Sequence, residues 1–376
     1  MDKILFIIDT LQTGGAEKSL LEITSRFKKY KPVFIQLYNG SELKPLFEEN
    51  GIEVIQLNLK PSYNFRSVAK LLIPIVKKIA PLIIHTTLFR SDLVGRALKR
   101  YIDVPLINSL VNNSYSRHRY KSLGLVDKMK LFAIQQWDRM TVKNVNLFVS
   151  NSESIKITNG AALGIPLDKI KVIYRGRDRN KYQMTDEIRK QIRESLGLVN
   201  EKIFLNVSRL LDRKGQIDLI RAFAKFVPHC SNARLWIAGE GQLRIRLENE
   251  IRENRLEGKV ILLGNRKDVP NLLASADYFV FPSHYEGLPG ALVEAMMARI
   301  PIIASAIPEN LECIDASMAL LYPRGEVEAL ASCLHEAVTA NWTEKKELAY
   351  QKAVNVFDIN MVAMRYEEAY GGLLDS

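Results

Sequence analysis

Two glutamates in the segment EGLPGALVE, Glu286 and Glu294, are the residues whose type and spacing point most directly to chemistry. The run from Ala276 to Phe281 before them has strand composition, and the run from Ala291 to Ala298 has helical spacing. One carboxylate therefore belongs to a loop and the other to the start of a helix. Because helical side chains lean toward the N-terminus of their helix, Glu294 is predicted to point back toward the Glu286 loop.

This junction suits a ligand that is anionic and rich in hydroxyl groups. Carboxylates accept paired hydrogen bonds from neighbouring hydroxyls, while the free N–H groups and the positive end of a helix attract phosphates. A nucleotide sugar has both kinds of group. The alternative is that Glu294 is a solvated or capping residue, which is the usual role of a glutamate at such a helical position.

A second candidate segment, NVSRLLDRKGQIDLIRAF, places Arg209 just past a predicted strand and Lys214 directly before a predicted helix. An arginine binds phosphate oxygens in a fork and a lysine acts as a point charge, so together they can stabilise a leaving diphosphate. Arg213 is expected to be a solvated cation. The chain has neither an Asp-x-Asp motif nor a histidine and carboxylate cluster at metal spacing, so we predict no metal site and a reaction that needs no metal.

Gly14 and Gly15 follow the first predicted strand, where the lack of a side chain allows the backbone to approach a ligand closely. The pattern is not GxGxxG, and no acidic residue clearly ends the second strand. A dinucleotide site is therefore not indicated.

The elements that would position these residues alternate between strand and helix along the whole chain, which predicts two parallel, doubly wound α/β sheets. A polar segment, 178–201, separates two domains, 1–179 and 180–356. In open parallel sheets ligands bind at the carboxyl ends of the strands, so two facing sheets would place a cleft between the two candidate regions. The predicted strands are 3–8, 32–37, 52–57, 82–84, 104–107, 146–149 and 171–174 in the first domain, and 202–207, 234–238, 260–263, 278–281, 300–304 and 318–321 in the second.

Composition indicates an ordinary soluble protein of two domains. The chain has 376 residues, of which 47% are hydrophobic and 25% charged. No apolar stretch is long enough for a membrane span, and the N-terminus lacks the apolar run of a secretion signal. Its three cysteines are far apart and odd in number, which favours a reducing compartment and thus the cytoplasm.

The charge is uneven along the chain. Residues 1–180 contain 29 Lys and Arg against 15 Asp and Glu, net +14, whereas the remainder has 24 against 27, net −3. No nucleic-acid-binding signature accompanies the basic half, so nucleic acid is not a predicted partner. Basic and apolar residues mix in the segment 121–143, which favours an anionic membrane surface. The alternative is an ordinary packed helix with Leu131, Ile134, Trp137 and Met140 facing the core.

In order, the segments TGGAEKSL, IIHTTLFRSDLVGRAL, VSNSES, SRLLDRKG, IAGEGQLRIRLE and the long run from Val260 to Ser305 cover most of the chain. In this context the sequence resembles the retaining GT-B glycosyltransferases of family 4. The resemblance implies two Rossmann-like domains facing each other across a cleft, with the nucleotide sugar bound by the C-terminal domain and the acceptor by the N-terminal one. It also implies that a terminal helix, 357–376, crosses back onto the first domain.

The resemblance implies a role for each matching residue. Glu294 would bind the ribose and Glu286 the donor sugar, while Arg209 and Lys214 would hold the diphosphate; Glu286, Arg209 and Lys214 are the candidate catalytic residues. The other implied donor contacts are the backbone at Leu288, Pro289, Gly290 and Ala291, the base-binding loop at Asn265 and Arg266, and Gly15 from the opposite domain. On the acceptor side stand Gly14, His85, and Asn112 or Asn113, the last two where the family commonly has a histidine. An asparagine amide can donate a hydrogen bond there but cannot carry charge.

The function implied is transfer of a sugar from a nucleoside diphosphate sugar to a hydroxyl of a glycan or lipid-linked acceptor, with retention of configuration, at the inner face of the cell membrane. We expect front-face attack in which the leaving phosphate helps to deprotonate the acceptor. Two alternatives remain: a nucleotide-sugar 2-epimerase, and a non-catalytic protein that binds glycans or lipids. Release of nucleoside diphosphate only when an acceptor is added would favour transfer.

Overall fold

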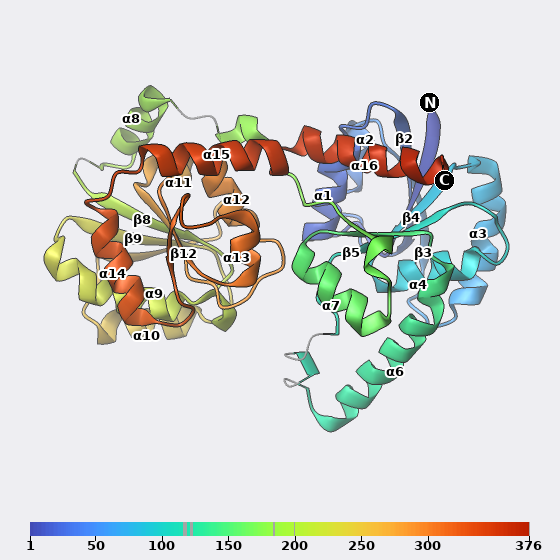
Figure 1. Cartoon of the computed structure of the whole chain (residues 1–376), viewed down its shortest axis with the longest axis horizontal. Coiled ribbons are helices and arrows are strands. Elements are labelled where there is room, and N and C mark those ends of the chain that lie inside the picture. Colours follow the sequence, from blue (N-terminus) through green and yellow to red (C-terminus); the bar gives the residue numbers. More distant parts are fainter. Residues whose placement is uncertain (116–118, 121–122, 183–184, 199, 376) are drawn as a thin grey trace. The chain divides into compact units, whose positions relative to one another are not determined.

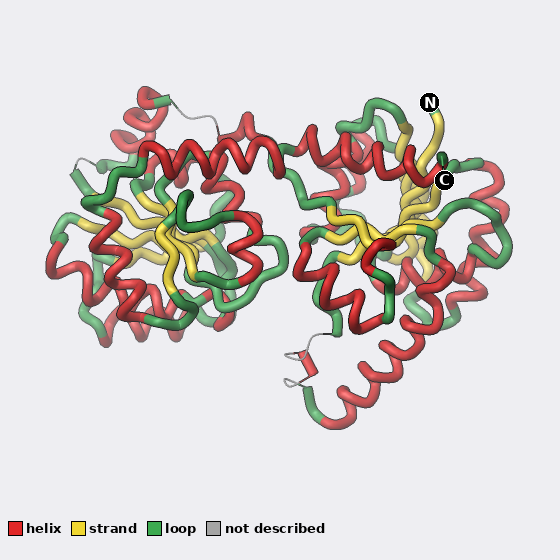
Figure 2. The backbone as a smooth tube through the Cα atoms, in the orientation of Figure 1, coloured by secondary structure: helices red, strands yellow, loops and turns green. Residues whose placement is uncertain are grey.

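The chain forms two compact α/β units. The computed structural model describes residues 1–115, 119–120, 123–182, 185–198 and 200–375. Unit 1 consists of Met1–Gly176 together with Ile359–Ser376, and unit 2 of Arg177–Asp358 (Figure 1). In each unit a central sheet is covered by helices (Figure 2).

Unit 1 contains a seven-stranded parallel sheet in the order β3-β2-β1-β4-β5-β6-β7. The order reverses between β1 and β4, and such a switch point is where ligands bind in sheets of this kind. The apolar run Ile4–Ile8 in β1 is almost fully buried, as a strand covered on both faces requires. The strands are β1 Asp2–Ile8, β2 Tyr30–Tyr38, β3 Glu53–Leu59, β4 Ile83–Thr87, β5 Leu106–Leu110, β6 Leu147–Ser150 and β7 Ile170–Val172.

Two of the helices around this sheet begin at residues whose side chains cap them. The Asn64 side chain accepts a hydrogen bond from the Ser67 N–H, and the Ser152 side chain accepts one from the Ile155 N–H. Gly164 ends a helix in the left-handed conformation. The described helices of unit 1 are α1 Gly15–Thr24, α2 Lys44–Glu49, α3 Phe65–Ile79, α4 Phe89–Leu98, α6 Leu125–Thr141, α7 Glu153–Leu163 and α16 Ile359–Leu374, with short 3₁₀ turns at Val142–Asn144 and Leu167–Lys169.

Helix α16 completes the core of unit 1. Val362, Tyr366 and Tyr370 are buried in one apolar cluster with β1 residues such as Ile4 and Phe6. At the same contact the Glu367 carboxylate accepts hydrogen bonds from the backbone N–H groups of Lys28 and Lys29, at 2.8 and 2.6 Å. The last helix of the chain is therefore part of the first sheet's hydrophobic core.

Unit 2 contains a six-stranded parallel sheet in the order β10-β9-β8-β11-β12-β13. Its strands are β8 Lys202–Val207, β9 Ala233–Ala238, β10 Val260–Gly264, β11 Tyr278–Phe281, β12 Ile302–Ser305 and β13 Leu320–Tyr322. Its described helices are α8 Asp186–Ser195, α9 Gln216–Phe226, α10 Arg244–Glu253, α11 Val269–Ser275, α12 Gly290–Met297, α13 Pro308–Cys313, α14 Val327–Ala337 and α15 Thr343–Phe357, with 3₁₀ turns at Arg179–Tyr182, Asp212–Lys214 and Val227–His229.

The predicted fold class, two doubly wound α/β domains, is confirmed, since each predicted strand overlaps an observed one. The structure divides after Gly176 and again after Asp358. Whether the two units face each other across a cleft stays a prediction.

Helix α6 keeps an apolar face exposed. It lies within the predicted segment 121–143, of which Lys121 and Ser122 fall outside the described residues. Leu131 is buried, as the packed-helix alternative expected, but Met140 is 65% exposed, and so are Leu125, Met129 and Phe132 at 75%, 66% and 57%. Within the described part of the chain, no helix is both long and apolar enough to cross a membrane.

Candidate active site

The predicted donor site is built at the carboxyl ends of β8 and β11 in unit 2. Arg209 lies just past β8, and Lys214 ends the short 3₁₀ turn before α9. Gly215 between that turn and α9 has φ +68°, and a Cβ there would lie 2.1 Å from the Pro282 carbonyl oxygen, just past β11. Only glycine lets the two loops approach so closely.

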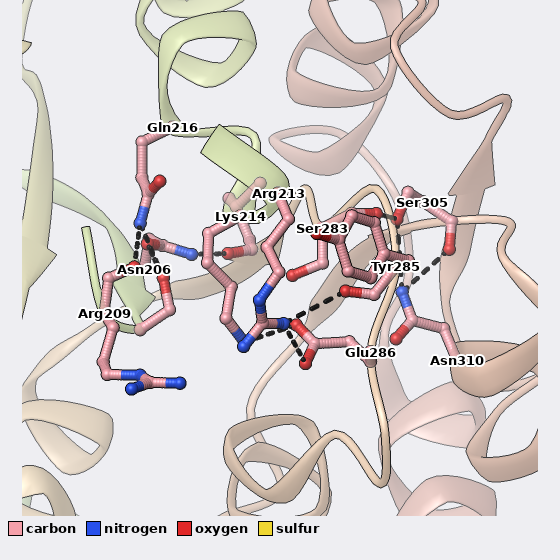
Figure 3. Close-up of polar contacts among 12 residues, drawn as sticks. Asn206, Arg209, Arg213, Lys214, Gln216, Ser283, Tyr285, Glu286, Ser305 and Asn310 are labelled. Atoms are coloured by element: carbon pink, nitrogen blue, oxygen red, sulfur yellow. Dashed lines mark hydrogen bonds and ion pairs between the residues drawn. The ribbon is translucent and has the colours of Figure 1, made fainter. Parts of the chain in front are cut away.

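Glu286 is held by two cations (Figure 3). Its Oε1 lies 2.5 Å from the Lys214 Nζ, and its Oε2 lies 3.2 Å from Nη1 of Arg213. The Glu286 side chain is only 5% exposed. Burial lowers the pKa of the Lys214 ammonium, and the Glu286 carboxylate opposes that shift. The expectation that Arg213 is merely solvated was wrong, because its guanidinium pairs with Glu286 and stacks over Tyr285.

Hydrogen bonds to β12 and α13 hold the loop that carries Glu286. The Ser305 hydroxyl donates to the Ser283 carbonyl at 2.5 Å, and the Asn310 amide donates to the Ser305 carbonyl at 2.9 Å. Figure 3 shows Ser283, Ser305 and Asn310 close to Tyr285 and Glu286. Buried hydrogen bonds of this kind fix the direction of the Glu286 side chain.

Arg209 presents an exposed guanidinium, which makes no ion pair with any described residue. Its backbone carbonyl accepts a hydrogen bond from the Gln216 amide at 2.9 Å, and the same amide donates to the Ser208 hydroxyl at 2.8 Å. Asn206 in turn donates to the Val280 carbonyl and so links the ends of β8 and β11. Sequence reasoning missed Asn206 and Gln216. The available signals were that Asn206 is a polar residue within a mostly apolar strand and that Gln216 is a polar residue at the start of α9.

Glu294 lies in α12 and is paired with a residue that sequence reasoning did not select. Its Oε1 accepts a hydrogen bond from the Arg177 Nε at 2.7 Å. The same guanidinium lies against Gly290, where a Cβ would be 2.1 Å from the Arg177 Nη2. The start of α12 therefore tolerates no side chain at Gly290 unless Arg177 moves. The unusual segment YRGRD, in which Arg177 lies, was the feature of the sequence that could have pointed to this residue.

Several predicted donor residues line one cavity of about 510 Å³. They come from the ends of β8 and β10 and from α12, and Gly239 and Glu240 after β9 join them. Arg266 in this cavity is paired with Asp268: its Nε donates to Oδ1 at 2.7 Å and its Nη2 donates to Oδ2 at 2.6 Å. The predicted residues in the lining are Arg209, Asn265, Arg266, Ala291 and Glu294.

The turn from Leu288 to Gly290 leads directly into α12. The Gly290 N–H donates to the Leu288 carbonyl at 2.9 Å, and the Leu292 N–H donates to the Pro289 carbonyl at 3.0 Å. The predicted backbone contacts therefore stand beside Glu294, at the N-terminus of this helix.

The residues predicted on the acceptor side, and Gly15, belong to unit 1. Gly14 caps α1, and a Cβ there would lie 2.1 Å from a carboxylate oxygen of Glu17. Asn112 and Asn113 follow β5, and Asn112 lines a cavity of about 310 Å³. The approach of Gly15 to the donor phosphates stays a prediction.

The position of His85 contradicts its predicted role on the acceptor side. The ring is fully buried, its Nδ1 is 2.9 Å from the Tyr370 hydroxyl, and its Nε2 is 2.8 Å from the Ser109 hydroxyl. Burial lowers the pKa of His85 to about 3. With both nitrogens engaged inside unit 1, His85 connects β4, β5 and α16 and offers no atom to an acceptor.

A comparison with protein families matches residues 188–354 to the family described as glycosyl transferases group 1. This part of the chain is therefore similar to that family. The matched region carries both glutamates, Arg209 and Lys214, so the family match and the cluster in unit 2 coincide. Among the described residues, no group of three or more histidines, cysteines or carboxylates is placed to hold a metal ion.

Curated relatives of this chain include proteins named as glycosyltransferases. The UDP-Gal:α-D-GlcNAc-diphosphoundecaprenol α-1,3-galactosyltransferase of Escherichia coli is 30% identical over 61% of this chain and 58% of its own length. The capsular polysaccharide biosynthesis glycosyltransferase CapH of Staphylococcus aureus is 25% identical over 98% of this chain and 99% of its own. Two archaeal relatives, 30% and 34% identical, are matched over only 62% and 30% of their length. The chain thus spans less than two thirds of several relatives.

Among solved structures, Alr3699/HepE of Anabaena, in complex with UDP and glucose, superposes with a TM-score of 0.82. The two proteins are 23% identical, and the match covers 99% of this chain and 100% of that one. At this identity the likeness establishes the fold.

Proposed function

We propose that this protein transfers a sugar from a nucleoside diphosphate sugar to a hydroxyl group of a glycan or lipid-linked acceptor, with retention of anomeric configuration. The observation that carries the proposal is the cluster in unit 2. Two carboxylates suited to ribose and sugar hydroxyls, Glu294 and Glu286, lie with Lys214 and Arg209 near the strand ends. Arg209 makes no ion pair within the described part of the chain. The match of residues 188–354 to the family of glycosyl transferases group 1 supports the same reaction.

The mechanism follows from what these side chains can do. In the proposed mechanism Arg209 and Lys214 bind the diphosphate and stabilise the negative charge that grows on it as the glycosidic bond breaks. Glu286, fixed by Lys214 and Arg213, orients the donor sugar through its hydroxyls. The acceptor hydroxyl attacks the anomeric carbon on the face from which the diphosphate leaves, and its proton passes to a departing phosphate oxygen. These cations supply the charge for which other enzymes use a metal, so we propose that turnover survives EDTA.

The direct test is a panel of nucleotide sugars scored by thermal stabilisation. A ligand at a hundred times its dissociation constant adds about 2.7 kcal/mol to the free energy of unfolding. We expect at least one UDP-sugar to stabilise the protein and to release UDP only when an acceptor is added. Stabilisation without acceptor-dependent release would contradict transfer. Conversion of the donor to its 2-epimer would identify the rival reaction.

A membrane-linked acceptor fits the surface of unit 1. The exposed apolar residues of α6 stand among basic ones, including Lys128 and Lys130, in the half of the sequence that carries net +14. Basic, apolar helices of this kind bind the surface of anionic bilayers. One relative acts on a diphosphoundecaprenol-linked sugar by its name. We therefore propose that the protein transfers its sugar at the inner face of the cell membrane.

A further inference from the structure

The loop that carries Glu286 also contains a histidine that has no part in the proposed mechanism so far. His284 lies three residues past the end of β11, and its ring Nε2 is 2.7 Å from Oδ2 of Asp218, in the first turn of α9. Because a carboxylate only accepts hydrogen bonds, Nε2 of His284 carries a proton and donates to Asp218. The pair therefore joins the loop of Glu286 to the helix that follows Lys214.

The backbone of His284 is held as well. Its N–H donates to the Arg213 carbonyl at 2.8 Å, and its carbonyl accepts from Nη1 of Arg324 at 3.3 Å. Arg213 in turn donates through Nη1 to the Tyr285 carbonyl and to Oε2 of Glu286, both at 3.2 Å. His284 thus contacts α9 through its side chain and the turn before α9 through its backbone.

These contacts bear on how Glu286 meets Lys214. Figure 3 shows the two side chains reaching toward each other from separate segments of unit 2. Backbone contacts join the loop only to the turn that ends at Lys214, whereas the pair of His284 and Asp218 attaches it to α9 itself. Leu219 of this helix is fully buried in the core of unit 2. The direction of the loop is therefore set against a rigid element, as a precisely placed site requires.

The alternative is an ordinary surface ion pair. The side chains of His284 and Asp218 are 33% and 21% exposed, and pairs exposed to this degree contribute little to the free energy of unfolding. Variants that lack the pair are therefore expected to fold. A matched pair is available for comparison, since Nζ of Lys225 in α9 lies 2.8 Å from Oε1 of Glu328 in α14, a helix that carries no candidate site residue.

We propose that His284 is a positioning residue for sugar transfer, which together with Asp218 fixes the loop so that Glu286 meets the donor sugar in the reactive geometry. This role rests on the proposed function and deepens it. His284 neither contacts the substrate nor transfers a proton; it acts through Glu286. A misplacement of about 1 Å in a group that positions a substrate can cost roughly a hundredfold in rate, so a partly loosened loop is expected to slow turnover measurably.

The first test is steady-state kinetics with a UDP-sugar donor. We expect His284→Ala and Asp218→Ala each to lower kcat about tenfold, with the donor KM within about twofold of the wild-type value. Because the two residues act as one pair, the double variant should lose about as much as either single variant. His284→Gln, whose amide can still donate to Asp218, should recover most of the turnover. Lys225→Ala is the control and should behave as the wild type.

Three kinetic results overturn the proposal. They are a near-normal kcat in His284→Ala, losses that multiply in the double variant, and a loss in His284→Gln equal to that in His284→Ala. The wild type reports separately on the reaction itself. A wild-type protein that releases no UDP from any UDP-sugar in the presence of acceptors refutes the proposed function, and this inference with it.

The second test needs no turnover and measures amide hydrogen exchange in the free protein. The His284 N–H is bonded to the Arg213 carbonyl, so exchange in peptides that span 282–286 reports on opening of the loop. We expect exchange at least about fivefold faster there in His284→Ala and Asp218→Ala than in the wild type and Lys225→Ala, with β8 peptides alike in all four proteins. Unchanged exchange in the loop would show that the pair does not hold it. Faster exchange throughout unit 2 would show that the pair serves stability instead.

Discussion

At the scale of single residues, the candidate site is a set of paired opposite charges. Glu286 is held by Lys214 and Arg213, and Glu294 by Arg177. The sugar and ribose hydroxyls of a donor would share or replace these contacts, and its diphosphate would attract the same cations. We therefore expect donor binding at this site to exchange ion pairs within the protein for contacts with the donor.

Replacement of Glu294 and replacement of Glu286 should change different kinetic parameters. Glu294→Ala removes a contact that ribose makes in both the ground and transition states, so mainly the KM for the donor should rise. Glu286→Ala removes an orienting contact beside the reacting sugar and leaves Lys214 without its partner, so mainly kcat should fall. Steady-state kinetics with a UDP-sugar donor measures both. Glu248→Ala, at an exposed helical position, is the control. A pure rise in KM in both variants would refute these roles.

Arg209→Ala and Lys214→Ala should each cost about 3 kcal/mol of transition-state stabilisation, comparable to removal of one preorganised donor from an oxyanion site. Because both cations act on the same phosphates, the double variant should lose less than the sum of the single losses. The measurement is kcat/KM for the three variants, with Arg246→Ala as an exposed control in the same unit. Near-normal turnover in either single variant removes that residue from the leaving-group site.

At this scale the sequence predicted a set of candidate residues but not the contacts that hold them. Glu286, Glu294, Arg209 and Lys214 could be found because their spacing relative to strands and helices is local. The pairing of Arg177 with Glu294 could not, since it joins residues 117 positions apart. The burial of His85 depends on α16, which arrives from the far end of the chain.

At the scale of elements, the strands were the most predictable feature. Parallel strands covered on both faces are continuous apolar runs, and such runs are visible in a sequence. The ends of elements were less predictable: the run predicted at 171–174 is the strand Ile170–Val172. The exposed face of α6 could not be assigned either, because its apolar residues fit both a packed and an exposed helix.

Helix α6 should bind anionic vesicles. We expect binding to phosphatidylglycerol vesicles that weakens as salt is raised, because exposed charges are screened beyond ~8 Å at physiological ionic strength. Phe132→Ser, at a side chain 57% exposed, should weaken binding about tenfold, since it removes one large apolar group from the contact. Ile245→Ser, at an exposed apolar position of unit 2, is the control. Equal binding by both variants, or no binding at low salt, would rule out this surface.

The contact between His85 and Tyr370 should make unit 1 sensitive to acid. Burial lowers the pKa of His85 from 6.5 to about 3, so the unfolded chain binds a proton that the folded one refuses. Stability should therefore fall as pH drops from 6.5, by at most about 1.4 kcal/mol per pH unit from this residue. His85→Gln should flatten the dependence of the unfolding midpoint on pH between 6.5 and 4. His229→Gln, at an exposed ring, should leave it unchanged, and parallel slopes in all three proteins would disprove the linkage.

At the scale of the whole molecule, the asymmetry in charge follows the two units. The basic half of the sequence coincides with most of unit 1, which carries α6, whereas the proposed donor site lies in the other half. The position of the basic residues follows from charge counts, and the two sheets were predictable from the alternation of strands and helices. The relation of the units to each other is not encoded in such local patterns.

The placement of α16 also affects the order in which the protein is made. Unit 2, Arg177–Asp358, is continuous in the sequence, so all of its strands have left the ribosome before the last helix is synthesised. Unit 1 lacks Tyr366 and Tyr370, which belong to the core around β1, until unit 2 has been synthesised. The sheet of unit 1 therefore keeps part of its apolar surface uncovered while unit 2 emerges. Exposed apolar surface on a nascent chain favours aggregation, so unit 1 depends on protection until α16 has been made.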